Sequence, residues 1–157
     1  MKKYMQKKLN NEKGMTLIEL LAVIVIIAII AAIAIPAIGN IIENSRVGAI
    51  KSDGQNALQA AELLLIDDPK FLENATGNKI VITNLVSDYL DDEGSFAGDT
   101  TFAITKPAGQ LVLTATGAVG SVKVQFNGAD KGKINALENN ADVQESVTAG
   151  EVGVIAR

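Results

Sequence analysis

The stretch KGMTLIELLAVIVIIAIIAAIAIPAI, residues 13–38, decides the fold of this chain. A basic, polar beginning gives way at residues 14 and 15 to an apolar run in which Glu19 is the only charged residue. The run exceeds the roughly 20 apolar residues that an α-helix needs to cross the hydrocarbon core of a bilayer. The sequence therefore predicts a membrane-spanning helix near the N-terminus.

The charges beside this run predict its orientation. Residues 1–14 contain one acidic residue, Glu12, and five lysines, at positions 2, 3, 7, 8 and 13. Because the cytoplasmic flanks of membrane helices are enriched in Lys and Arg, we expect a single-pass protein of the cytoplasmic membrane, with its N-terminus inside and residues 40–157 outside. Without residues 1–14 the counts fall from 14 basic and 18 acidic residues to nine and 17, a net charge of −8. Such an acidic body disfavours nucleic acid as a partner without excluding it.

The helical pattern continues beyond the apolar run. In residues 40–66, most apolar positions recur at spacings of three or four, the stripe of an amphipathic helix: Ile42, Ala49, Ile50, Ala57, Leu58, Ala61, Leu64 and Leu65. Pro69 ends the pattern, because the residue before a proline is pushed out of the helical region. We therefore expect one helix over residues 15–66, roughly 75 Å long at 1.5 Å per residue.

The second half of the chain has the pattern of a small sheet. Residues 70–99 predict a connecting region, with a short helix at 85–90 and a turn at 91–94. Alternating and β-branched residues then predict strands at 101–105, 111–116 and 121–126. Glycine-containing turns are expected at residues 107–109, 117–120 and 127–128, and a fourth short strand is expected at 152–155.

These elements predict an α+β fold. An antiparallel meander of three or four strands has an apolar face that must be covered, and the amphipathic half of the long helix can cover it. The predicted fold is therefore a long N-terminal helix, transmembrane and then amphipathic, packed on a small antiparallel sheet. The predicted parts are a leader at 1–14, an apolar helix at 15–39 and a globular domain at 40–157.

The composition excludes several kinds of site. The chain has no cysteine and no histidine, so it lacks thiol chemistry, the commonest general base and the commonest metal ligand. No phosphate-binding loop is present, and we expect neither enzyme activity nor a catalytic residue, cofactor or metal. An acidic stretch at residues 91–99 and lysines 123, 131 and 133 are better explained as solvated surface than as a calcium or DNA site.

The segment KGMTLIELL, residues 13–21, resembles the prepilin signal of type IV pilins and pseudopilins. In that family a membrane peptidase cuts after the glycine, the new first residue is N-methylated, and a glutamate stands fifth in the mature chain. The resemblance implies cleavage between Gly14 and Met15, methylation of Met15, and a role for Glu19 in filament assembly. Pro36 stands where these proteins commonly carry a proline, whereas Met15 departs from the more usual phenylalanine. The pilin-like fold of long helix and small sheet agrees with the fold predicted above.

Physical chemistry explains why Gly14, Glu19 and Pro36 would stand at these positions. A charged side chain in a membrane helix costs about 2.5–3.5 kcal/mol on insertion scales, so Glu19 needs a partner. Cleavage would remove Lys13 but create an α-amino group on Met15, which can pair with Glu19 in the same chain or in a neighbouring one. Gly14 lets a peptidase approach the backbone closely because it has no Cβ. Pro36 predicts a kink or local unwinding near residues 32–39.

The resemblance implies a structural subunit of a type IV pilus-like surface filament, located in the membrane before assembly and at the cell surface afterwards. Its implied partners are prepilin peptidase, the pilus assembly machinery, other minor pilins, the membrane through residues 15–39, and further copies of itself. Two alternatives remain open: a pseudopilin of a type II secretion or competence DNA-uptake system, and a single-span surface binding protein that does not polymerise. An ordinary signal peptide cut near residues 34–37 is the simplest competing interpretation of the apolar run.

Overall fold

A computed structural model of the chain describes residues 16–86 and 88–157. Its described residues up to Asn40 form one unit, and Ile41–Arg157 form a second, compact one. Helix α2, Leu17–Asp67, begins in the first unit and ends in the second. This confirms the predicted single long helix. The helix ends one residue later than predicted, and the N–H of Asp68 still donates to the carbonyl of Leu64 at 2.8 Å before Pro69 follows.

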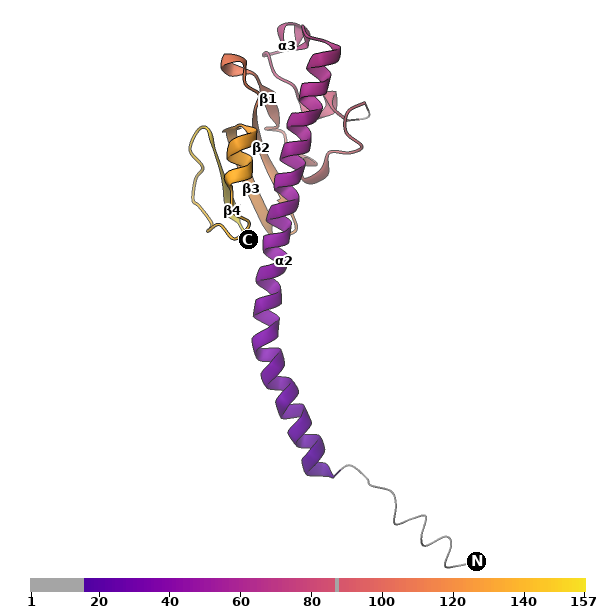
Figure 1. The fold of residues 1–157 in the computed structure, drawn as a ribbon, viewed down its shortest axis with the longest axis vertical. Coiled ribbons are helices and arrows are strands. Elements are labelled where there is room, and N and C mark those ends of the chain that lie inside the picture. Colours follow the sequence, from indigo (N-terminus) through magenta and orange to yellow (C-terminus); the bar gives the residue numbers. More distant parts are fainter. Residues whose placement is uncertain (1–15, 87) are drawn as a thin grey trace, which may run out of the picture. The chain divides into compact units, whose positions relative to one another are not determined.

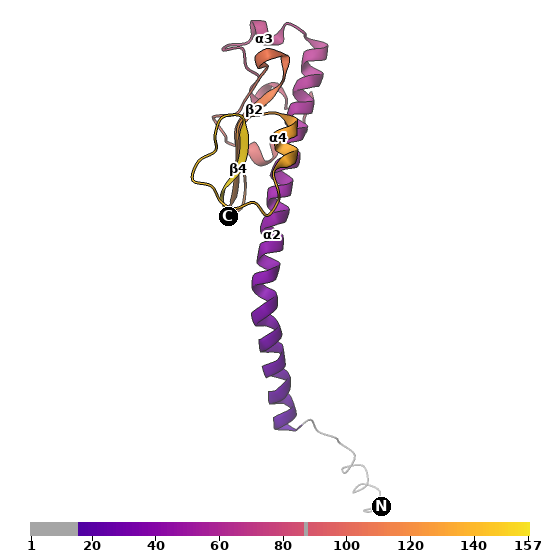
Figure 2. The same cartoon turned by 60° about the vertical axis from the view of Figure 1, so that its left-hand side comes forward.

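The sheet is a four-stranded antiparallel meander in the order β1-β2-β3-β4, as predicted (Figures 1 and 2). Its strands are β1 Ala103–Thr105, β2 Val112–Val119, β3 Val122–Ala129 and β4 Glu151–Ala156. A turn of 3-10 helix, η3 Pro107–Gly109, joins β1 to β2 where a turn was expected. The tight connection between β2 and β3 places Val119 opposite Val122. The fold is therefore α+β.

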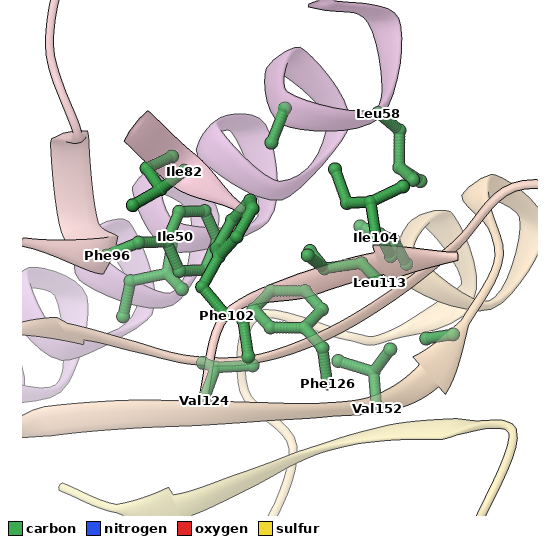
Figure 3. Close-up of a cluster of buried hydrophobic side chains, with 14 of the residues drawn as sticks. Ile50, Leu58, Ile82, Phe96, Phe102, Ile104, Leu113, Val124, Phe126 and Val152 are labelled. Carbon is green, nitrogen blue, oxygen red and sulfur yellow. The ribbon is translucent and has the colours of Figure 1, made fainter. Parts of the chain in front are cut away.

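The second half of α2 packs on one face of this sheet. Five of the eight residues in the predicted stripe are buried: Ile50, Ala57, Leu58, Ala61 and Leu64. Ile42 and Ala49 are exposed, so the stripe begins later than the sequence suggested. Phe96 contacts two other rings of the core, at 5.3 Å from Phe102 and 5.7 Å from Phe126 in edge-to-face geometry (Figure 3). Every residue of the hydrophobic core lies between Val47 and Val154, so the unit Ile41–Arg157 contains a complete core of its own.

The helices of the connecting region are short in its described residues, 70–86 and 88–99. They are α3 Phe71–Asn74, η1 Ile82–Asn84 and η2 Gly94–Phe96. The predicted helix at residues 85–90 is wrong, because the helical turn lies earlier and Leu85 already caps its end. The N–H groups of Tyr89 and Leu90 both donate to the carbonyl of Leu85, which closes a turn instead of starting a helix. Leu85 is fully buried and anchors this turn to the core.

The predicted turn at residues 117–120 is partly wrong. Strand β2 continues through Gly117, and only Gly120, with φ of 63°, lies in the turn. A Cβ on Gly117 would come closer than 3.0 Å to the side chain of Ile50 and 3.2 Å from Ser95 Oγ. This glycine therefore allows α2 to approach the sheet closely, which is a known use of glycine inside a strand.

The predicted tight turn at Asn127-Gly128 is a β-bulge within β3. Leu113 pairs with Ala129 and Thr114 with Asn127, so Gly128 is the extra residue, with φ of 67°. Glycine suits this position because it adopts positive φ without strain. Just beyond the strand, helix α4, Lys131–Ala136, begins with Asp130, whose side chain accepts from the N–H of Lys133 at 2.9 Å.

Candidate assembly site

Two side chains, Thr16 and Glu19, cap the N-terminus of α2. The backbone N–H of Thr16 donates to Glu19 Oε2 at 2.7 Å, and the Thr16 hydroxyl donates to the same oxygen at 2.8 Å. The backbone N–H of Glu19 lies 3.3 Å from Thr16 Oγ1. This reciprocal arrangement is a capping box, in which residues three apart satisfy backbone N–H groups that the helix leaves free.

The capping box gives Glu19 a partner within its own chain. Membrane cost alone predicts the Met15 amine as the partner of Glu19 and overlooks Thr16, although the pattern Thr-x-x-Glu before an apolar run is a known sign of a helix start. A carboxylate at this end is also favoured by the positive end of the helix dipole. Gly14 and Met15, the predicted cleavage and methylation site, lie outside the described residues.

The apolar part of α2 has no buried residue within the described range. The window of α2 that is long and apolar enough to cross a membrane is 0% buried. Exposed large side chains run from Leu17, at 86%, to Ile42, at 47%. Pro36 lies inside α2, and residues 32–39 are helical throughout, so the local unwinding expected there is not observed. A surface of this kind needs lipid or other apolar helices around it.

Two of the other charged residues singled out in the sequence, Asp99 and Lys133, have structural partners. Asp99 accepts from the N–H of Thr116 at 2.6 Å and from the N–H and hydroxyl of Thr101, so it caps the edge of β2 beyond the end of β1. Lys133 donates to Glu151 at 2.7 Å, and this hydrogen bond raises the pKa of Lys133. Among the described residues, no group of three or more His, Cys, Asp or Glu side chains is arranged to hold a metal ion.

Comparison with known proteins identifies the N-terminal segment. Residues 9–35 match the family model described as the prokaryotic N-terminal methylation motif. No curated protein and no solved structure matches the chain. The matched residues contain both the predicted processing junction and the Thr16–Glu19 capping box. The chain therefore carries the class III prepilin signal of the type IV pilin and pseudopilin family.

Proposed function

We propose that this chain is a structural, non-catalytic subunit of a type IV pilus-like surface filament. The observation that carries the proposal is the combination of a methylation motif at residues 9–35 with a helix whose membrane-length apolar window contains no buried residue. In this proposal prepilin peptidase removes residues 1–14, and Met15 becomes the N-methylated first residue. Residues 15–39 then anchor the subunit in the cytoplasmic membrane and later form the filament core.

The exposed apolar half of α2 suits both the subunit in the membrane and the subunit in the filament. A bilayer can cover it before assembly, and the corresponding helices of other copies can cover it afterwards, because both surroundings are apolar. The unit Ile41–Arg157 has its own core, so it needs neither of these surroundings to fold. Residues 40–157 would therefore be displayed outside the membrane and on the filament surface. The assembly machinery and other minor pilins would be the subunit's partners.

Glu19 is the residue that we propose to fix the position of one subunit against the next. Cleavage before Met15 would create an ammonium group one residue from Thr16, whose N–H already binds the Glu19 carboxylate. This carboxylate can pair with that ammonium group, in the same chain or in a neighbouring one. An ion pair in apolar surroundings disfavours slipped arrangements, because slippage leaves each charge without its partner.

Intact mass measurement on protein from native membranes and from sheared filaments tests the proposal. We expect a chain that starts at Met15 and carries one additional methyl group, present in both fractions. Gly14→Val should block cleavage, because it adds bulk at the scissile bond. An N-terminus near residues 34–37 would instead support a secretory signal peptide. A mature, methylated chain that never enters filaments would point to a non-polymerising role and overturn the proposed function.

A further inference from the structure

The two edges of the sheet are closed in different ways. At the β1 edge, Ile80 and Ile104 exchange two backbone hydrogen bonds of 2.8 Å, and both side chains are fully buried. At the opposite edge, β4 pairs with β3 on one side only. Among the described residues, the single backbone bridge on the other side of β4 joins Val143 to Val154. Each edge is therefore covered by one isolated bridge, with two backbone hydrogen bonds at the β1 edge and one at the β4 edge.

The segment that covers β4 is residues 138–150, here called the edge strap. Its backbone contact with the strand is a hydrogen bond from the N–H of Gln144 to the carbonyl of Val154, at 2.7 Å. Most of the strap is exposed, and Val147, with 7% exposure, is its one buried hydrophobic residue. Gly153 makes room for the strap, because a Cβ there would come within 3.0 Å of the side chains of Gln144 and Val147.

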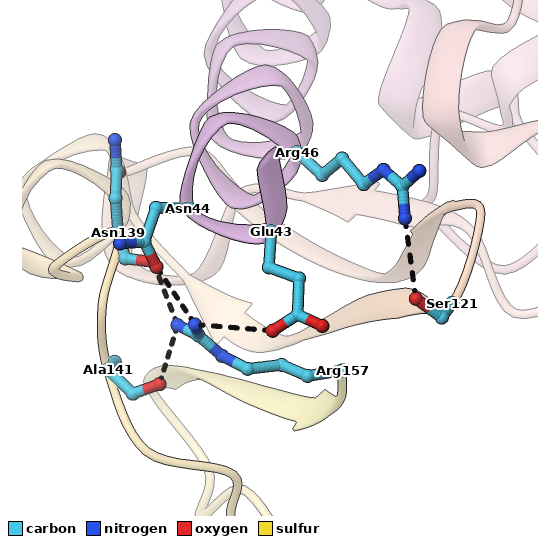
Figure 4. Close-up of polar contacts among 7 residues, drawn as sticks. All are labelled: Glu43, Asn44, Arg46, Ser121, Asn139, Ala141 and Arg157. Carbon is cyan, nitrogen blue, oxygen red and sulfur yellow. Dashed lines mark hydrogen bonds and ion pairs between the residues drawn. The ribbon is translucent and has the colours of Figure 1, made fainter. Parts of the chain in front are cut away.

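Polar side chains fasten the edge strap at both ends. Arg157 Nη2 donates to the carbonyls of Asn139 and Ala141, each at 2.8 Å, and Nη1 donates to Asn44 Oδ1 at 2.9 Å (Figure 4). The guanidinium thus joins the first part of the strap to α2. At the far end, Asn127 Nδ2 donates to the carbonyl of Val147 at 2.9 Å. The strap is consequently held by a few directed hydrogen bonds and little apolar contact.

An uncovered strand edge offers free N–H and C=O groups to any other strand, and pairing through such edges leads to unwanted association. We propose that the edge strap, fastened by Arg157, keeps a second copy of this chain from pairing with β4. The closed edge leaves the apolar half of α2 as the surface for self-association. This inference concerns the globular unit and does not require that the chain forms filaments.

Two variants of the full chain in detergent micelles test the proposal. Arg157→Ala removes the hydrogen bonds that hold the first part of the strap, whereas Gln144→Pro removes the N–H that binds Val154 and leaves Arg157 in place. We expect amide exchange in residues 138–154 to become roughly tenfold faster in Arg157→Ala, the change that loss of charge-assisted hydrogen bonds produces. We also expect both variants to form dimers whose fraction rises with protein concentration in sedimentation. Slow exchange at Ile80 and Ile104 would establish that the fold is retained.

Lys133→Ala is the matched control, because it removes the ion pair with Glu151 on the same strand but touches no strap contact. We expect Lys133→Ala to have the same amide exchange rates and the same sedimentation as the unmodified chain. Unchanged exchange in Arg157→Ala would overturn the fastening role of Arg157. Faster exchange without any dimer in either variant would overturn the edge-protection role. The micelle covers the apolar half of α2 in every sample, so neither result depends on whether filaments form.

Discussion

Substitution of Gly117 by alanine tests the packing of α2 on the sheet. The added methyl group would come closer than 3.0 Å to Ile50 Cγ2 and 3.3 Å from Phe96 Cε1. Ile50 and Phe96 are almost fully buried, so neither side chain has free space to move into. We therefore expect the strand or the helix to shift, although alanine alone would suit a strand slightly better than glycine.

The loss of unfolding free energy expected for Gly117→Ala follows from overpacking of the core. Forcing an extra methyl group into a packed core costs about 1–3 kcal/mol of unfolding free energy. Truncation of Ile50 to alanine costs about 2–5 kcal/mol by itself, because it leaves a cavity. The same truncation removes the atom that the new methyl group would strike. The double variant should then lose less stability than the sum of the two single variants, by about 0.5 kcal/mol or more.

Urea unfolding of a fragment of residues 40–157 measures these differences, since that fragment contains the whole core. Ala118→Val is the control: it adds bulk at the adjacent exposed position of β2 and should change stability by at most about 0.5 kcal/mol. If Gly117→Ala is as stable as the unmodified fragment, or if the two losses simply add, the close approach of Ile50 to Gly117 does not limit the packing.

Three further predictions concern single side chains. Asp99→Ala should lower the stability of the fragment by about 1–3 kcal/mol in urea unfolding, because the N–H of Thr116 loses its 2.6 Å acceptor. The hydrogen bond to Asp67 raises the pKa of Tyr89, the only tyrosine in the fragment, so Asp67→Ala should lower that pKa in an absorbance titration. The neutral form is the one favoured by folding, so this contribution to stability is lost as pH rises above the ordinary tyrosine pKa. Glu19→Val should leave membrane insertion and cleavage intact and sharply reduce the yield of filaments. Glu19→Gln keeps the helix cap but removes the charge, so normal filaments from this variant would refute the ion-pair role.

The sequence predicts the major elements because their patterns are local and strong. The apolar run from residue 15 needs no tertiary context, and the period of three to four beyond residue 40 indicates which face of α2 is buried. The period of two after residue 100 indicates strands. The order of β1, β2 and β3 follows from the short connections between them, since neighbouring strands joined by tight turns pair antiparallel. Residues 130–150 separate β3 from β4, so the place of β4 in the sheet does not follow from a tight turn. These features locate the core without any knowledge of which side chains touch.

The structural roles of individual glycines cannot be predicted from such local patterns. Gly117, Gly120 and Gly128 look alike in the sequence, and turns are the usual interpretation of all three. In the structure one permits the approach of a helix, one lies in a turn, and one forms a bulge. The difference for Gly117 depends on Ile50, which is far away in the chain, and no local pattern contains that information.

For Glu19, in contrast, the local sequence pattern is sufficient: Thr-x-x-Glu before an apolar run already predicts its hydrogen-bond partner, Thr16. The membrane cost of a charged Glu19 predicts an oppositely charged partner, which would be the amine that cleavage creates. The hydrogen bonds to Thr16 show that its carboxylate is already engaged at the helix start. A glutamine could make the same cap, since either residue serves at this position of a capping box. The cap therefore explains why a polar side chain stands at position 19, and the helix dipole and the proposed pairing with an ammonium group both give reasons for its negative charge.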